Sequence, residues 1–345
     1  MGLGTRSWID WVGISASILA VTLVVAKNVE RKPAQRQLLN VSYDPTRELY
    51  RELNTAFSAQ MLRTTGQVVE IRQLHGGSSR QAQRVGTGEV KADVVTLGLP
   101  SDIQGLHRLG LIGDSWMSRL PNESRPYYST IVFVVRKGNP YRIHDWPDLV
   151  APGVEIITAD PKVSGNGKLV ALAAWGSVVT RGGSPDAARQ FLRALYTHAP
   201  FLADAARTAG NAFALEKQGD VQLAWENEAR REVAESGGGL ELVYPPVSIR
   251  AEPAVAWVDA NVAADGNADL ARDYLKFLFT EEAQEIIARH GYRPALPLAE
   301  ERHLRDAPPI QLFAVTEIAR DWDDAQNLFF AENGIIAALY QPKPR

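Results

Sequence analysis

Short apolar segments alternate with tight turns and helical segments along the chain, and this alternation constrains the fold more than any other feature. Residues 37–43, 68–74 and 92–100 each have the length and apolar content of a buried strand. Asp44-Pro45 follows the first of them and opens a helical stretch, since Asp is a favoured N-cap and Pro a favoured first helical residue. The repeated order of strand, turn and helix predicts an α/β fold with a largely parallel sheet.

Length and composition set the outer limits. A chain of 345 residues predicts two domains, and 45% hydrophobic with 22% charged residues is typical of a folded globular protein. Cysteine is absent, which excludes disulfides, thiolate zinc sites, a cysteine nucleophile and a lipid-modified cysteine. With 37 basic and 40 acidic residues the net charge is −3, so a strongly basic nucleic-acid binder is excluded as well.

The N-terminal segment differs from the rest. Residues 11–26 read WVGISASILAVTLVVA, a run without a charge. This run is shorter than the about 20 apolar residues of a membrane-spanning helix, but it suits the apolar core of a secretory signal. Val24 and Ala26 are the small residues that a cleavage site needs. We therefore predict that residues 1–26 are a signal peptide or, if uncleaved, an N-terminal anchor, and that the remainder is exported.

Small residues recur where strands turn into helices. Asp44, Ser78, Ser164-Gly165-Asn166 and Ala206 all lie at or near an expected helix start. A helix N-terminus carries unpaired backbone N–H groups and about half a positive charge. Gly and Ser allow the backbone to approach a small ligand closely. Each turn alone is an ordinary cap; several that converge predict an anion site that needs no cationic side chain.

Other motifs are excluded or left open. The segment from Ser164 to Leu169 lacks the first glycine and the final Ser or Thr of a nucleotide-binding loop. The six histidines are scattered, without the spacing of a metal site, and there is no GxSxG elbow. We therefore expect no enzyme, no metal and no cofactor. Trp225 is either a core residue or a ligand contact with a single N–H donor.

Nine segments resemble those of the periplasmic sulfate-binding proteins and occur in that family's order. The resemblance runs from residue 37 to about 340 and implies the type II periplasmic binding-protein fold, with two lobes and the ligand in the interdomain cleft. It also implies a monomeric receptor that delivers sulfate to the permease and ATPase subunits of an ABC importer. The segments are LLNVSYDPTRELY (38–50), HGGSSRQ (75–81), STIVFVVRKGNP (129–140), IHDWPDL (143–149), DPKVSGNGK (160–168), LAAWG (172–176), LAWENEA (223–229), AEPAVAWVD (251–259) and YRP (292–294).

The resemblance also implies a division into lobes and a set of ligand contacts. Residues 37–128 and 251–345 are expected in the first lobe and 129–250 in the second, with hinges near 126–132 and 246–256. We expect Arg207 and Lys168 to lie behind the ligand contacts and to add to the positive electrostatic potential there, or else to lie exposed at the surface. The contacts carried over are Asp44, Ser78, Ser164, Gly165, Asn166, Ala206 and Trp225.

Three of these positions bear on the ligand. Asn166 stands where the sulfate receptors commonly have glycine, and the loop around Ala206 departs from the family pattern. The thiosulfate branch of the family is similar, but its counterpart of LAWENEA tends to lack the tryptophan, so Trp225 favours sulfate.

Sulfate has no proton at neutral pH and can only accept hydrogen bonds. A site made of donors alone is expected to hold sulfate and to refuse hydrogen phosphate, whose proton would go unpaired. The Asp44 carboxylate is expected to turn away from the anion, toward the N–H groups of its own helix. Three alternatives stay open: a receptor for thiosulfate or another tetrahedral oxyanion, an anchored enzyme acting on a sulfated or phosphorylated substrate, and a membrane-anchored sensing module without transport.

Overall fold

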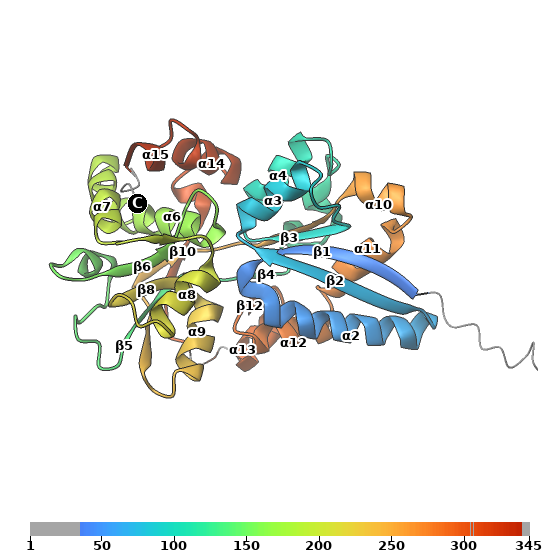
Figure 1. Cartoon of the computed structure of the whole chain (residues 1–345), viewed down its shortest axis with the longest axis horizontal. Coiled ribbons are helices and arrows are strands. Elements are labelled where there is room, and N and C mark those ends of the chain that lie inside the picture. The colour runs from blue at the N-terminus through green and yellow to red at the C-terminus, as the bar shows by residue number, and fades with distance from the viewer. Residues whose placement is uncertain (1–34, 304, 306, 340–345) are drawn as a thin grey trace, which may run out of the picture.

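The computed structural model describes residues 35–303, 305 and 307–339. These residues form two α/β lobes that lie side by side, with the N-terminal elements in one lobe and the middle of the chain in the other (Figure 1). The two-lobed α/β fold expected from the sequence is confirmed. The segment 1–26, for which we predicted a signal peptide or an anchor, lies outside the described residues.

The first lobe is built on a sheet with strand order β11-β3-β1-β2. Strands β1, β2 and β3 are parallel, as the alternating pattern predicted, and β11 joins β3 in the antiparallel direction. The strands are β1 (Gln35–Tyr43), β2 (Val68–Gly76), β3 (Val94–Leu97) and β11 (Ala254–Trp257). The other elements of this lobe are η1 (Asp44–Thr46), α2 (Arg47–Thr65), α3 (Ser78–Gly86), α4 (Pro100–Arg108), η2 (Trp116–Arg119), α5 (Pro121–Ser124), β4 (Tyr127–Tyr128), α10 (Asp259–Asp265), α11 (Ala268–Phe277), α12 (Glu281–Arg289), β12 (Arg293–Pro294) and α13 (Pro297–His303).

The second lobe contains a mixed sheet with strand order β7-β6-β8-β5-β9. Its central helix α6 is buried over most of its length, which explains why its sequence is apolar on all sides. The strands are β5 (Ile131–Arg136), β6 (Ile156–Ala159), β7 (Leu202–Ala203), β8 (Val221–Trp225) and β9 (Leu240–Val243). The helices are η3 (Trp146–Val150), α6 (Gly165–Val179), α7 (Pro185–Thr197), α8 (Ala206–Ala214) and α9 (Glu226–Glu235).

Two chain crossings between the lobes are bonded to each other. Ser129 leads into β5, and Ala251 follows β10 (Val247–Ile249). Their backbones exchange two N–H···O bonds, each 2.9 Å long, in an antiparallel bridge. Both crossings lie in the regions 126–132 and 246–256, where hinges were expected, and their role as hinges stays a prediction. Because so few residues join the lobes here, a change in their relative orientation requires rotation at only a few backbone positions.

The C-terminal segment departs from the expected division. We predicted that all of 251–345 returns to the first lobe, but β13 (Gln311–Phe313) pairs in parallel with β10. The ring of Phe313 covers Gly176 of α6, where a methyl group would lie 2.0 Å from Phe313 Cζ. After η4 (Val315–Glu317), α14 (Trp322–Phe330) and α15 (Ile335–Leu339) lie beside α6 and α7 (Figure 1). The helical pattern of this segment shows that one face is apolar, but it cannot show against which lobe that face packs.

We predict that Phe313→Ala lowers the free energy of unfolding by about 3–5 kcal/mol, because it removes a buried ring that fills the space above Gly176. Amide hydrogen exchange should accelerate in β13 and α14 but not in β2. Chemical denaturation and exchange mass spectrometry measure both effects. Equal exchange rates in β13 for the wild type and the variant would contradict this account of the C-terminal segment.

Candidate anion site between the lobes

Helix starts from both lobes meet at one place. A methyl group on Gly165, the first residue of α6, would lie 3.1 Å from Cβ of Ser78, the first residue of α3. A methyl group on Gly77 would lie 2.5 Å from the Val163 carbonyl oxygen and 3.2 Å from that of Asp204, two residues before α8. The short helix η1 contacts α8 as well. The turns that the sequence singled out separately are therefore neighbours in the fold.

The backbone N–H groups at these helix starts have no acceptor within their own helices. The first helical hydrogen bonds are donated by Gln81, Lys168 and Ala209, each four residues after the N-cap. The N–H groups of the preceding residues, including Ser78, Gly165, Asn166 and Ala206, lie before this point. Each helix start also carries a partial positive charge. All four residues are buried.

Gly167 explains how α6 comes to point at this place. A methyl group on Gly167 would lie 2.4 Å from the Ala159 carbonyl oxygen and 2.6 Å from Pro161 N. The helix therefore begins in direct contact with the end of β6, an approach that a side chain at this position prevents. Ser164 is the N-cap of α6, is buried, and makes no side-chain capping hydrogen bond. Its hydroxyl is therefore available to a ligand.

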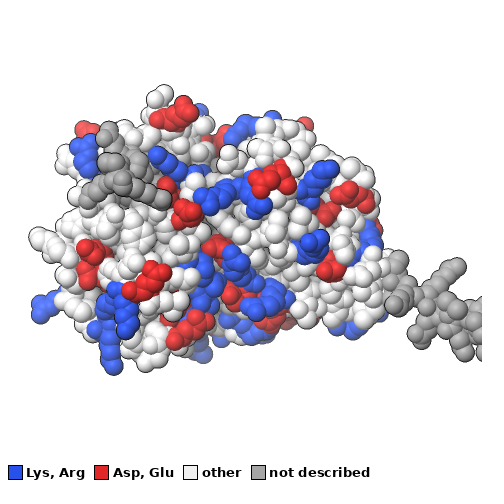
Figure 2. All heavy atoms as spheres, in the orientation of Figure 1, with Lys and Arg blue, Asp and Glu red and all other residues white. Residues whose placement is uncertain are grey.

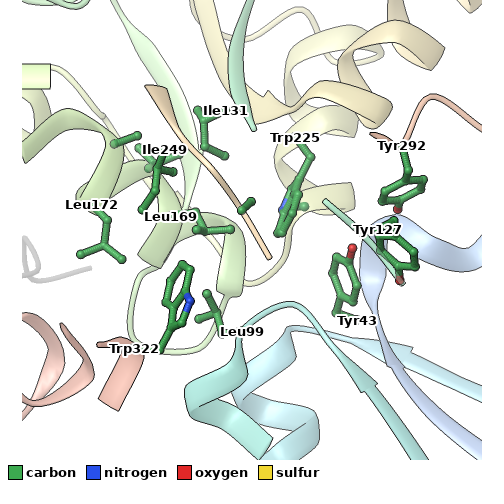
Figure 3. Close-up of a cluster of buried hydrophobic side chains, with 14 of the residues drawn as sticks. Tyr43, Leu99, Tyr127, Ile131, Leu169, Leu172, Trp225, Ile249, Tyr292 and Trp322 are labelled. Carbon is green, nitrogen blue, oxygen red and sulfur yellow. The ribbon is translucent and has the colours of Figure 1, made fainter. Parts of the chain in front are cut away.

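Trp225 contributes a buried hydrogen-bond donor that has no partner in the described part of the chain. It is the last residue of β8 and the N-cap of α9, and its side chain is completely buried. Its indole Nε1–H has no hydrogen-bond partner among the described residues. Leaving a buried donor unpaired costs about 1–3 kcal/mol. The indole faces Tyr43 of the first lobe, with 5.2 Å between ring centroids, and Tyr127 and Tyr292 lie beyond it (Figure 3).

Asp44 differs from our expectation in one respect. Its carboxylate does not cap its own helix: Oδ1 accepts hydrogen bonds from Arg47 Nε at 3.0 Å and Nη2 at 2.5 Å. The physical reason is that Tyr43 occupies the N-cap and Asp44 the first position of η1, which puts the carboxylate beside Arg47. The prediction that this carboxylate turns away from the anion stays a prediction, with Arg47 as its partner.

His75 is a neighbour of the site that the sequence did not identify. Its Nδ1 lies 3.2 Å from the Tyr43 carbonyl oxygen, which also accepts a 2.6 Å bond from Thr46 Oγ1. These bonds polarise the peptide unit whose N–H belongs to Asp44. Burial lowers the pKa of His75 more than the hydrogen bond to Tyr43 raises it.

The Ser78 hydroxyl already has hydrogen-bond partners within the protein. It donates to Asp102 Oδ2 at 2.6 Å and accepts from Gly98 N at 2.9 Å, so only its backbone N–H remains for a ligand. Asp102 in α4 also lies 3.7 Å from Lys168 Nζ of α6. Lys168 is buried and donates to Gln326 Oε1 of α14 at 2.8 Å. Lys168 is thus an ion-pair partner between the lobes, and the alternative of an exposed surface charge was wrong.

Arg207 is likewise bound by carboxylates. Its guanidinium donates to both oxygens of Glu48 in α2, at 3.2 and 2.8 Å, and to both of Glu228 in α9, at 3.1 Å each. Burial alone would raise the pKa of Glu48, but the hydrogen bonds and charge of Arg207 lower it to about 2. Basic and acidic side chains gather along the boundary between the lobes (Figure 2). Arg207 joins the lobes, and two carboxylates balance its charge.

A buried carboxylate makes a third ion pair between the lobes. Glu226, the first residue of α9, is completely buried. It accepts hydrogen bonds from Arg293 of β12 at 2.7 and 3.1 Å and from Tyr244 at 2.9 Å. Arg293 belongs to the YRP segment and Glu226 to the LAWENEA segment of the resemblance, yet nothing in the sequence pairs them.

Within the described residues there is no group of three or more histidine, aspartate or glutamate side chains that could hold a metal ion. Over the same part of the chain, no helix has the length and apolar character to cross a membrane.

Comparison with known proteins decides the family. The family model described as "bacterial extracellular solute-binding protein" matches residues 38–293. The chain belongs to this family. It is 46% identical to the sulfate-binding protein of Escherichia coli, over 92% of this chain and 94% of that protein. It is 40% identical to the thiosulfate-binding protein of Pseudomonas aeruginosa, over 95% of this chain and 98% of that protein.

A solved structure supports the same assignment. The sulfate-binding protein SubI from Mycobacterium tuberculosis superposes with a TM-score of 0.78 at 27% identity, covering 86% of this chain and 99% of that one. The family consists of solute-binding proteins, so the chain is not an enzyme.

The low pKa of Glu48 predicts an acid-dependent loss of stability. The carboxylate ionises near pH 2 when paired with Arg207 and near pH 4.5 when free, so the stabilisation is complete above pH 4.5 and is lost as the pH falls toward 2. In Glu48→Gln we expect this part of the pH dependence of the melting temperature to be reduced. Glu282→Gln, an exposed residue of α12, is the control. Identical pH profiles for Glu48→Gln and the wild type would contradict the pairing.

Proposed function

We propose that the chain captures sulfate between its lobes and delivers it to an ABC importer. The observation that carries the proposal is the buried, unpaired Nε1–H of Trp225, next to helix starts that meet from both lobes. A tetrahedral dianion can accept hydrogen bonds from several directions at once. The proposed contacts are the backbone N–H groups of Asp44, Ser78, Gly165, Asn166 and Ala206, the Ser164 hydroxyl and the Trp225 indole.

The strength of such a site follows from the number of donors. Hydrogen bonds to a charged group contribute about 1.5–3 kcal/mol each, so about seven contribute roughly 10–20 kcal/mol. Desolvation, closure of the lobes and lost translational freedom oppose much of this. A dissociation constant in the micromolar range or below, about −8 kcal/mol or better, is consistent with these terms.

Thiosulfate is the second candidate, because a relative of 40% identity is a thiosulfate-binding protein. Sulfate remains the first candidate, since all four of its atoms around sulfur accept hydrogen bonds well, whereas one donor of the site would meet the weakly accepting terminal sulfur of thiosulfate. We further propose that the protein is exported, acts as a monomer, and meets the permease subunits, and through them the ATPase, in its closed form. The bonded crossings at Ser129 and Ala251 are the proposed hinge.

Calorimetric titration of the sulfate-free protein tests the ligand. We expect sulfate to bind with the same affinity at pH 6 and pH 8, because neither sulfate nor the backbone donors titrate there. Tighter binding of thiosulfate would assign the protein to the thiosulfate branch. Failure of both anions to bind would refute the receptor proposal and favour the sensing module without transport.

Replacement of the indole donor is a second test. We predict that Trp225→Phe weakens sulfate binding about ten- to a hundredfold, because it removes one hydrogen bond to a charged group while keeping an aromatic ring beside Tyr43. The matched control is Trp257→Phe on β11, which removes an indole N–H that bonds Asp259 at 3.0 Å. An unchanged dissociation constant in Trp225→Phe would exclude this residue from the site.

A further inference from the structure

A buried glutamate in the second lobe is bonded to a neutral side chain instead of to a cation. Glu232 lies in α9 and is only 5% exposed. Its Oε1 accepts a hydrogen bond from Gln222 Nε2 of β8 at 3.3 Å. A methyl group on Gly210 of α8 would lie 2.2 Å from the same oxygen. The carboxyl group is therefore enclosed where α8, α9 and β8 meet, and α8 and α9 are neighbours in the second lobe (Figure 1).

Two oxygen atoms of this pair are left without a donor. Glu232 Oε2 and Gln222 Oε1 are both buried and have no hydrogen-bond partner among the described residues. A carboxylate and an amide oxygen only accept hydrogen bonds, so neither atom satisfies the other while Glu232 is ionised. An unpaired carboxylate in a buried place is costly, and such a group takes up a proton instead. A proton on Oε2 turns this acceptor into a donor.

The two side chains have the shapes that a doubly bonded pair needs. Carboxyl and amide groups are both planar, and each unpaired oxygen is attached to the same carbon as the atom that makes the 3.3 Å contact. In such a pair the Gln222 nitrogen donates to Oε1 of Glu232, and the protonated Oε2 donates to the Gln222 oxygen. One proton thus supplies both missing hydrogen-bond interactions.

The charged neighbours of Glu232 are engaged elsewhere. On α9 these are Glu228, Arg231 and Glu235, and on α8 it is Arg207. Arg207 donates to Glu228 at 3.1 Å, and Arg231 donates to Glu235 at 2.7 Å. Burial raises the pKa of Glu232 to about 7 and the charge of Glu228 adds to this, whereas the hydrogen bond from β8 and the two arginines act in the opposite direction.

A cavity of about 650 Å³ borders Glu232 and gives the ionised form a second position. Its basic lining residues are Arg136 of β5, Lys217 and Arg231, and its other acidic residue is Glu235. A carboxylate that turns away from β8 therefore has space and basic side chains beside it, whereas a carboxylate that stays leaves two buried acceptors facing no donor.

We propose that Glu232 holds a proton in mildly acidic to neutral solution and shares it with Gln222 Oε1, which fastens α9 to β8. In alkaline solution the proton is lost, the carboxylate turns into the adjacent cavity, and the contact between α8 and α9 loosens. All the residues of this device belong to the second lobe, so the proposal does not depend on the anion site. The affinity for sulfate is expected to be unaffected.

Thermal unfolding of Glu232→Gln between pH 5 and pH 8 tests the proposal. A glutamine here keeps both hydrogen bonds at every pH, because its amide donates to Gln222 Oε1 and accepts from Gln222 Nε2. The wild type loses this stabilisation as the pH rises from 4.5, the pKa in the unfolded chain, through about 7. We therefore expect the melting temperature of the variant, relative to the wild type, to rise by at least about 2 °C from pH 5 to pH 8.

Infrared difference spectroscopy detects the proton itself. At pH 6 the wild type should show a carboxylic-acid C=O band that Glu232→Gln lacks. The matched control is Glu235→Gln, which removes the same charge from the same helix at an exposed carboxylate and should keep both the band and the pH profile of the wild type. A melting-temperature difference that stays constant or falls from pH 5 to pH 8, or the absence of the band at pH 6, would overturn the proposal.

Discussion

The structure depends on backbone N–H groups that have no acceptor inside their own helices. The starts of α3, α6 and α8 meet at the boundary between the lobes. The buried Trp225 indole packs against Tyr43, the N-cap of η1. The nearby cations do not supply a free charge, since Arg207 is held by Glu48 and Glu228, and Lys168 by Asp102. The positive potential at this place therefore comes from helix dipoles and peptide groups. This arrangement is suited to an anion that accepts hydrogen bonds from several sides.

The same ion pairs connect the site with the arrangement of the lobes. Arg207 joins α8 to α2, and Arg293 joins β12 to α9. Each ion pair therefore has one residue in the first lobe and one in the second. Separation of the lobes breaks these pairs and also draws Tyr43 away from Trp225. The pairing of Ser129 with Ala251 lies at the crossing that we propose as the hinge. In the proposed function, closure and completion of the donor set are one event, because donors from both lobes are proposed to surround one anion.

Much of this could be predicted from the sequence, for reasons visible in particular residues. Local signals fixed the strands and the helix starts, because a turn such as Asp44-Pro45 acts through neighbouring residues alone. The sequence could not show that the Asp44 carboxylate bonds Arg47, or that Arg293 pairs with Glu226 across 67 positions. The sequence also led us to place 311–339 with the first lobe, because it could not show that β13 pairs with β10 and that Phe313 covers Gly176. For Asn166 the notable signal was a departure from the family's usual glycine, and only the structure shows an unpaired oxygen there.

Anomalous diffraction from crystals grown with selenate in place of sulfate tests the central claim most directly. Selenate has the charge and shape of sulfate, and its selenium atom can be located without reference to the protein. The account predicts one strong selenium peak between Trp225 Nε1 and the starts of α3, α6 and α8, with oxygens within hydrogen-bond distance of the indole and of the N–H groups of Ser78 and Gly165. A peak beside surface arginines, with the Trp225 indole still unpaired, would contradict it.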